Sequence, residues 1–200
     1  MKIVTSVIRT AIALFCASIF SAAADLPRKA MDFAVQTGPD KYTWLSEYEG
    51  KTVVIAFILT TCPHCQFTTG VLTRIHKDYA GKGVVVLESA IEPMSSLHIP
   101  DFVKHFGVTF PVGYDEQNYV DKFLGKEENA PMMMPQVVLI DSKGMIRRQF
   151  AGDDTVFTEA IQETTLREAL DEILKGPAAP GSTPGSTPRP PAPKAQTKKQ

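Results

Sequence analysis

Two cysteines, Cys62 and Cys65, lie three positions apart and enclose Pro63 and His64. They follow an apolar, β-branched run over 53–59 and precede a stretch whose apolar residues have helical spacing. The N-terminus of a helix offers unpaired backbone N–H groups and the positive end of the helix dipole, and both favour a thiolate over a thiol. The pattern therefore predicts a redox-active pair, with Cys62 at the start of the helix and Cys65 one turn further in.

The residues between the cysteines support this chemistry. Pro63 suits the first turn of a helix, because its missing N–H would have no partner there. His64 can add positive charge or a hydrogen bond beside the Cys62 thiolate. Both residues are therefore candidates for supporting roles.

Other uses of a cysteine pair fit the sequence less well. A structural zinc site takes four N, O or S ligands, and His76, His98 and His105 show no close ligand spacing. Haem attachment requires a histidine directly after the second cysteine, where this chain has Gln66. A structural disulfide is an alternative, although so small a loop contributes little loop-closure entropy. We therefore expect neither a metal nor an organic cofactor.

Residues 1–24 have the pattern of a secretory signal peptide. Lys2 and Arg9 are followed by an apolar run over 10–20 and by small residues over 21–24. An uncleaved membrane anchor is the alternative, but crossing the hydrocarbon core takes about 20 apolar residues. We expect cleavage after residue 24 and export to the periplasm or another extracytoplasmic compartment, where disulfides persist.

The rest of the chain divides into one domain and a tail. Residues 25–175 hold all 22 acidic residues of the chain. The length of this segment is typical of a single domain. Residues 176–200 hold seven prolines and four basic residues, with Gly-Ser-Thr-Pro repeated over 181–188. This tail lacks large apolar side chains and cannot offset its ordering entropy, so we expect it to be disordered. The overall charge of −1 gives no sign of a nucleic-acid partner.

Alternating strand and helix patterns in the domain predict an α/β fold with a mixed sheet covered by helices. The segment 141–144 is typical of a hairpin turn, and Pro100 of the residue just before a short helix. The expected strands are 53–59, 84–87, 136–140 and 145–150, and the expected helices are 66–79, 101–106 and 159–174.

Three segments resemble the TlpA-like branch of the thioredoxin superfamily, within the wider redoxin group that includes alkyl hydroperoxide reductases. They are Gly50 to Phe57 followed by the Cys-Pro-His-Cys motif, Met134 to Gly144, and Phe150-Ala151-Gly152. The similarity covers residues 31–175 and implies a thioredoxin-like fold with an N-terminal extension and a mid-chain insertion. The dipeptide between the cysteines is also the one found in DsbA, the periplasmic disulfide oxidant.

The resemblance gives Pro135 a role as well. It implies a cis-proline that faces the two cysteines, with Met134 in contact with the substrate peptide. On the residues alone, an ordinary proline at the entry of a strand is the alternative. Met132 and Met133 would belong either to a soft apolar rim of the site or to the core.

Three positions depart from the family pattern. Thr61 stands just before the first cysteine, where the family often has a tryptophan. Ala56 stands where many thioredoxin-like proteins have a buried acid, and Thr68 stands where some TlpA-like reductases have a glutamate. The usual proton acceptor for Cys65 is therefore missing. Glu88 and Glu92 follow the second expected strand, but we expect both to be solvated surface charges.

These observations predict an exported thiol-disulfide oxidoreductase. Cys62 would form a mixed disulfide with a client protein, and Cys65 would resolve it. The partners would be clients with thiols or disulfides and a redox protein that recycles the enzyme. His64 should stabilise the reduced thiolate and so favours an oxidant, whereas the resemblance favours a reductant; we favour the oxidant.

Two further functions are alternatives. A thiol peroxidase of the redoxin group would carry Pro-x-x-x-Thr-x-x-Cys, but this chain has Ile55 and Leu59 at the proline and threonine positions. A copper chaperone would use Cys62 and Cys65, together with His98 or His105.

Overall fold

The computed structural model describes residues 26–128 and 130–176. The predicted signal peptide lies outside the described residues, and so does all of the predicted tail except Gly176. Within the described residues, no helix is long and apolar enough to cross a membrane.

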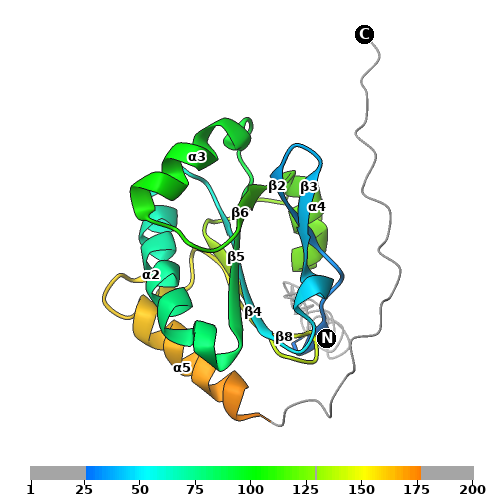
Figure 1. Ribbon diagram of the computed structural model, residues 1–200, viewed down its shortest axis with the longest axis vertical. Helices are drawn as coiled ribbons and strands as arrows, with labels where there is room; N and C mark the ends of the chain where they lie inside the picture. The colour runs from blue at the N-terminus through cyan, green and yellow to red at the C-terminus, as the bar shows by residue number, and fades with distance from the viewer. Residues whose placement is uncertain (1–25, 129, 177–200) are drawn as a thin grey trace, which may run out of the picture.

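Strands from both halves of the described chain form one mixed sheet (Figure 1). They are β1 (Arg28–Lys29), β2 (Ala34–Gly38), β3 (Lys41–Trp44), β4 (Thr52–Ile58), β5 (Val84–Ala90), β6 (Val112–Tyr114), β7 (Gln136–Ile140) and β8 (Met145–Phe150). Their order across the sheet is β1-β8-β7-β4-β5-β6-β2-β3. β4 lies at the centre, parallel to β5 and antiparallel to β7.

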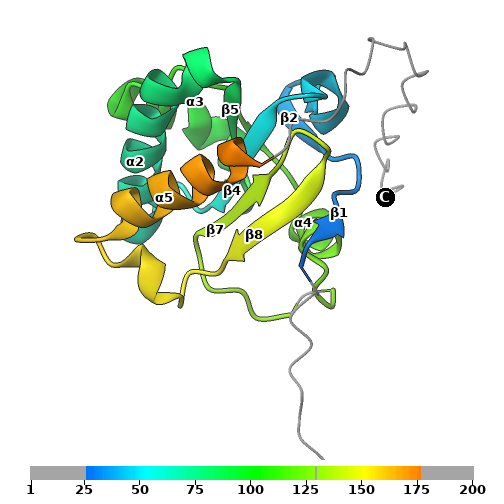
Figure 2. The ribbon, with the colours of Figure 1, turned by 90° about the horizontal axis from the view of Figure 1, so that it is seen from below.

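Helices cover both faces of this sheet (Figures 1 and 2). Three of them pack on one face and α4 packs on the other. The helices are α2 (Pro63–Tyr79), α3 (Ser95–Phe106), α4 (Gln117–Leu124) and α5 (Gln162–Lys175), with short 3-10 helices η1 (Leu45–Tyr48), η2 (Ala80–Lys82) and η3 (Thr155–Phe157). The predicted α/β class is therefore confirmed.

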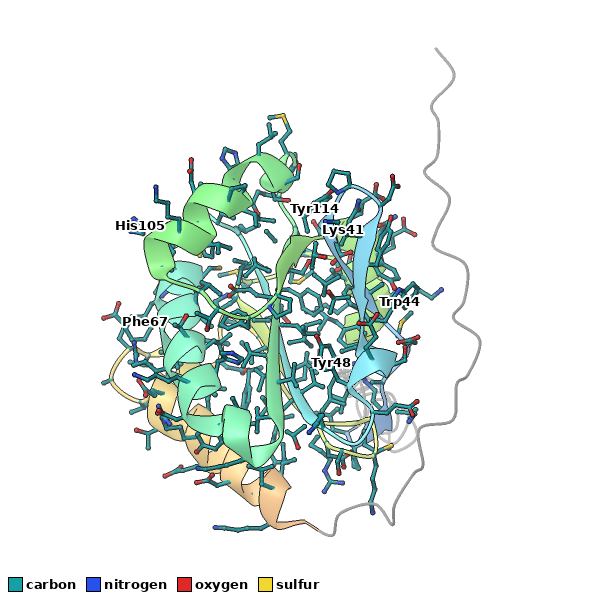
Figure 3. All side chains as sticks on the ribbon, viewed as in Figure 1. Lys41, Trp44, Tyr48, Phe67, His105 and Tyr114 are labelled. Carbon is teal, nitrogen blue, oxygen red and sulfur yellow. The ribbon has the colours of Figure 1, made fainter. Side chains whose placement is uncertain are left out.

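The core consists of two apolar clusters, one on each side of β4. Side chains alternate across a strand, so Val54, Ala56 and Ile58 face α2 and α5 while Ile55 and Phe57 face α4. All seven residues of β4 are buried, which explains why the strand is a continuous apolar run. Figure 3 shows the side chains that fill the space between the sheet and its helices.

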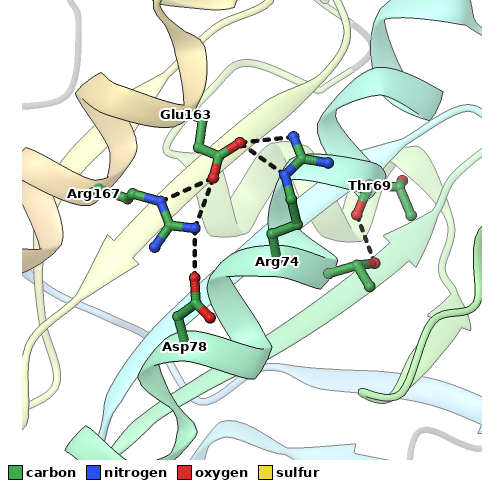
Figure 4. A network of polar contacts seen from close by, with 6 residues as sticks. Thr69, Arg74, Asp78, Glu163 and Arg167 are labelled. Carbon is green, nitrogen blue, oxygen red and sulfur yellow. Dashed lines mark hydrogen bonds and ion pairs between the residues drawn. The ribbon is translucent and has the colours of Figure 1, made fainter.

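Helices α2 and α5 are joined by a polar network at the surface (Figure 4). Arg74 and Arg167 both reach the Glu163 carboxylate at 2.7 Å, and Arg167 also contacts Asp78 at 2.8 Å. The hydrogen bond from Arg74 lowers the pKa of Glu163. These side chains are partly exposed, so each pair contributes at most about 1 kcal/mol. The network mainly fixes how α5 lies across α2.

The N-terminal segment supplies strands at both edges of the sheet. β1 pairs with β8, and the hairpin of β2 and β3 pairs with β6. This is the N-terminal extension that the resemblance implies. Gly113 in β6 permits the close approach of β2, because a Cβ there would collide with the carbonyl group of Gln36.

Five predicted elements differ from the observed ones. β4 covers 52–58 in place of 53–59, and α2 begins at Pro63 in place of residue 66. β5 continues to Ala90, beyond the expected end at 87, because Glu88 and Ser89 interrupt the apolar run but still pair with β4. α3 begins at Ser95, with the exposed Pro100 inside it, since Phe102 packs into the core and offsets the lost backbone hydrogen bond. α5 begins three residues later than expected. Strands β7 and β8 have the predicted bounds.

A half-buried carboxyl group joins β5 to the strands beside it. Asp115 follows β6 and accepts hydrogen bonds from the Ser89 hydroxyl at 2.6 Å and from the backbone N–H of Gln36. Its own N–H donates to the Ala90 carbonyl at 3.1 Å. Burial raises the pKa of Asp115 to about 7, although the hydrogen bonds oppose that rise.

This carboxyl should make the free energy of unfolding depend on pH. Its pKa is higher in the folded than in the unfolded chain, so between about pH 4 and 7 the folded state binds the extra proton. Stability should therefore fall as the pH rises through this range, by up to about 1.4 kcal/mol per pH unit for this group. The free energy of unfolding, measured with urea at several pH values, should fall less steeply with pH in Asp115→Asn than in the wild type. Asp101→Asn, on the exposed side of α3, should keep the wild-type slope; equal slopes for Asp115→Asn would contradict the assignment.

Candidate active site

The two cysteines lie where the central strand passes into α2. β4 ends at Ile58, and Cys62 caps α2 with an extended backbone (φ −80°, ψ 122°) before Pro63 begins the helix. The Cys62 side chain is partly exposed, whereas Cys65 is completely buried. Both are free thiols. A sulfur arriving from solvent can therefore meet Cys62 but not Cys65.

The surroundings of Cys65 favour its protonated form. Burial raises the pKa of this thiol most strongly, and the neighbouring Cys62 and Glu88 raise it further. The backbone N–H of Leu59 donates a hydrogen bond to the Cys65 sulfur at 3.4 Å and opposes the rise. Cys65 must lose a proton before it can attack a disulfide, so the site needs an acceptor for that proton.

Glu92 holds the loop between β4 and the first cysteine. Its carboxylate accepts hydrogen bonds from the backbone N–H of Thr60, at 2.8 Å, and from the Thr60 hydroxyl. From the other side, the Gln66 amide donates to the Thr60 carbonyl at 2.9 Å. The expectation that Glu92 is a solvated surface charge is therefore wrong. It lies in the site because the chain after β5 returns to the end of β4.

Glu88 also departs from its expected place at the surface. It lies in β5 with no solvent exposure, and its carboxylate is 2.7 Å from the Thr69 hydroxyl of α2. Burial raises the pKa of Glu88 to about 8, although the hydrogen bond from Thr69 lowers it. The expectation failed because a single glutamate at the end of an apolar run gives no sign that helix α2 will cover it.

The loop before β7 lies beside the C-terminal end of β4, close to the cysteines. Gln136 pairs with Phe57, so the chain before Gln136 runs beside the end of β4. The Met134–Pro135 peptide bond is cis, as the resemblance implies. Met134 packs against both apolar clusters, whereas Met133 is 61% exposed.

Gly152 shapes that loop from the neighbouring strand end. Its N–H donates to the Met133 carbonyl at 3.1 Å. A Cβ on Gly152 would collide with the Met134 carbonyl group, so a residue without a side chain is required here. This gives a physical reason for the glycine in the Phe150-Ala151-Gly152 segment.

The other candidate positions are occupied by neutral or exposed groups. His64 is exposed, and its carbonyl accepts a hydrogen bond from the Thr68 hydroxyl at 2.8 Å. Thr68 is buried and accepts a hydrogen bond from the Gln162 amide at 2.7 Å. Position 68 therefore holds a neutral pair where the resemblance would place an acid.

The histidines proposed for a copper site point elsewhere. His98 and His105 are both exposed on α3, and Figure 3 shows His105 on the outer side of that helix. Within residues 26–128 and 130–176, no three His, Cys, Asp or Glu side chains are grouped closely enough to hold a metal ion.

Met132 packs on the apolar cluster around α4, which favours core packing over a rim.

Comparison with known proteins identifies related enzymes. Thiol-disulfide oxidoreductase ResA of Bacillus thuringiensis subsp. konkukian is 24% identical over 151 residues, which cover 76% of this chain and 78% of that protein. ResA of Geobacillus thermodenitrificans is 29% identical over 127 residues, covering 63% of this chain and 69% of that protein.

Solved structures show the same fold. A thiol:disulfide interchange protein of the thioredoxin family from Chlorobium tepidum superposes with a TM-score of 0.59 at 21% identity, over 74% of this chain and 99% of that one. A DsbF homologue from Corynebacterium diphtheriae gives 0.60 at 21% identity, over 74% and 87%. The sequence model of the AhpC/TSA family matches residues 26–149. The chain is thus a thiol-disulfide oxidoreductase with a thioredoxin-like fold, and it belongs to the AhpC/TSA family.

Proposed function

We propose that this enzyme is exported and exchanges disulfides with the thiols of client proteins through Cys62 and Cys65. The observation that carries the division of roles is the difference in burial between the two sulfurs. Cys62 is open to solvent at the start of α2, while Cys65 is enclosed one turn further along. A client sulfur can therefore bond only to Cys62.

The exchange proceeds in two steps that are reversible. The Cys62 thiolate attacks one sulfur of a client disulfide, and the other client sulfur leaves as a thiolate with the bonding electron pair. Cys65 then loses its proton and attacks the Cys62 sulfur, so the mixed disulfide breaks and the first client sulfur also leaves. The client has gained two electrons and the enzyme holds a Cys62–Cys65 disulfide. Disulfide formation in a client runs the same steps backwards.

The loop around the cis-proline is the proposed contact for the client chain. It ends beside the strand that leads to the cysteines, and its backbone is held by Gly152 and Gln136. Met133 offers an exposed and flexible apolar side chain next to Met134 and Pro135. Such a surface suits clients that share a disulfide but differ in sequence.

The direction of electron flow depends on how far the reduced thiolate is stabilised. Cys62 has the N-terminus of α2 as one source of stabilisation, and His64 lies in the first turn beside it. Among the described residues, no Lys or Arg lies between Lys51 and Arg74. We propose that His64 makes the disulfide form the better oxidant, with disulfide reduction as the alternative direction.

Export can be tested on the protein itself. The mature chain should begin at residue 25, because the small residues over 21–24 suit signal peptidase. Intact-mass analysis of protein recovered from outside the cytoplasm should show the loss of residues 1–24. A mass that retains them would mean that the segment stays on the protein as an anchor.

The two cysteines should differ when each is replaced. Cys65→Ser should accumulate mixed disulfides with clients, because the sulfur that resolves them is gone. Cys62→Ser should accumulate few or none, since the remaining sulfur is buried. Diagonal gels of cells that express each variant measure this directly. Equal trapping by both variants would contradict the assigned roles.

Replacing His64 should change the redox equilibrium. If His64→Leu removes about 1.4 kcal/mol of thiolate stabilisation, the reduction potential of the cysteine pair should fall by roughly 30 mV. Titration in glutathione buffers gives the potential, and His105→Leu on α3 serves as a control for the loss of an exposed histidine. An unchanged potential in His64→Leu would leave disulfide reduction as the better assignment.

A further inference from the structure

Glu88 is a buried acid that has no role in the two exchange steps described above. It lies in β5, directly beside Ala56 of β4 and Val112 of β6 in the register of the sheet. Its side chain has no solvent exposure, and its Oε2 atom has no hydrogen-bond partner among the described residues. A buried carboxyl oxygen without a partner costs free energy, so its presence calls for an explanation.

One hydroxyl group connects Glu88 to the cysteine helix. The Thr69 hydroxyl is 2.7 Å from Oε1 of Glu88 and 3.0 Å from the backbone carbonyl of Cys65. A hydroxyl has a single proton to donate. When Glu88 is ionised, Thr69 must donate to the carboxylate. When Glu88 is protonated, the acid can donate to Thr69, which then donates to the Cys65 carbonyl. The protonation of Glu88 is thus linked to the turn of α2 that holds Cys65.

Charge repulsion couples the two groups more directly. An ionised Glu88 raises the pKa of the Cys65 thiol, and burial raises the pKa of Glu88 to about 8. The apolar surroundings therefore oppose two negative charges at once. Cys62 is the other titratable group that interacts with Cys65, while the neighbours of Glu88 in the sheet are Ala56 and Val112.

The other acids near the site are already engaged or face away. Glu92 accepts two hydrogen bonds from Thr60 at Oε1. Its Oε2 atom also lacks a partner among the described residues, but Glu92 is not among the groups that raise the pKa of Cys65. Asp115 bonds to Ser89, whose side chain points to the opposite face of β5 from that of Glu88. Position 68 carries a neutral threonine bonded to Gln162.

We propose that Glu88 is the acid–base partner of Cys65, and this inference rests on the proposed function. As Cys65 attacks the mixed disulfide, its thiol proton passes to the Glu88 carboxylate. The Cys65 sulfur bonds to the Cys62 sulfur, the bond from Cys62 to the client breaks, and the client sulfur leaves with the electron pair. In the reverse direction, Glu88 returns the proton to Cys65. The acid thus comes from β5, next to position 56, where the resemblance would have placed it.

The test follows the two steps separately in the reduced full-length chain. With Ellman's reagent, attack by Cys62 releases one thionitrobenzoate and resolution by Cys65 releases a second, and stopped-flow absorbance resolves both. Glu88→Gln keeps a partner for Thr69 but cannot take a proton. It should leave the first release unchanged, slow the second by at least about tenfold, and remove the pH dependence of the second step near pH 8.

Two further variants separate proton transfer from a structural effect. Asp115→Asn neutralises a half-buried acid beside the same strand and should leave both releases as in the wild type. Ala56→Asp combined with Glu88→Gln places a carboxyl on the neighbouring strand, and should restore a fast, pH-dependent second release. The proposal is overturned if Glu88→Gln keeps the wild-type second rate and pH profile, or if Asp115→Asn slows that step equally. Absence of the first release in the wild type would instead overturn the proposed function.

Discussion

The architecture depends on one constraint, which is that β4 is buried on both faces along its whole length. A strand in that position must be apolar throughout, and its ends are the only places where it can carry polar groups. The C-terminal end of β4, at Ile58, is where the chain turns through Thr60 and enters α2. The cysteines therefore lie at a helix N-terminus whose position is fixed by β4. This strand cannot shift without disrupting both apolar clusters.

Much of the fold could be read from the sequence because its central elements follow simple patterns. The continuous apolar run of β4, the hairpin of β7 and β8, and the helical spacing in α2 each depend on neighbouring residues only. Two strands that were not predicted, β1 and β6, depend on distant partners. β6 has three residues and pairs with β2, from the other end of the domain. Nothing within so short a segment indicates that partner.

In the candidate site, too, local sequence patterns do not reveal features that depend on distant parts of the chain. The cysteine pair, the preceding strand and the proline before β7 all follow from local patterns or from the resemblance. Glu88 and Glu92 did not, since a carboxylate at the end of a strand is exposed in most proteins. Glu88 is enclosed because α2 lies over it, and Glu92 is held in the site because the loop at Thr60 bonds to it. Burial of a polar side chain is decided by what is packed over it, and that is a property of the whole fold.

The arrangement of the sheet edges also has a consequence for the order of assembly. The outermost strands come from the first described residues, yet β1 pairs with β8 and β2 pairs with β6. β1 and β2 therefore lack these partners until β8 and β6 have been synthesised. The sheet is complete only once residue 150 is available. Until then β1 and the side of β4 that later pairs with β7 are open to pairing with other chains. Completion of the fold and protection against aggregation are thus the same late event.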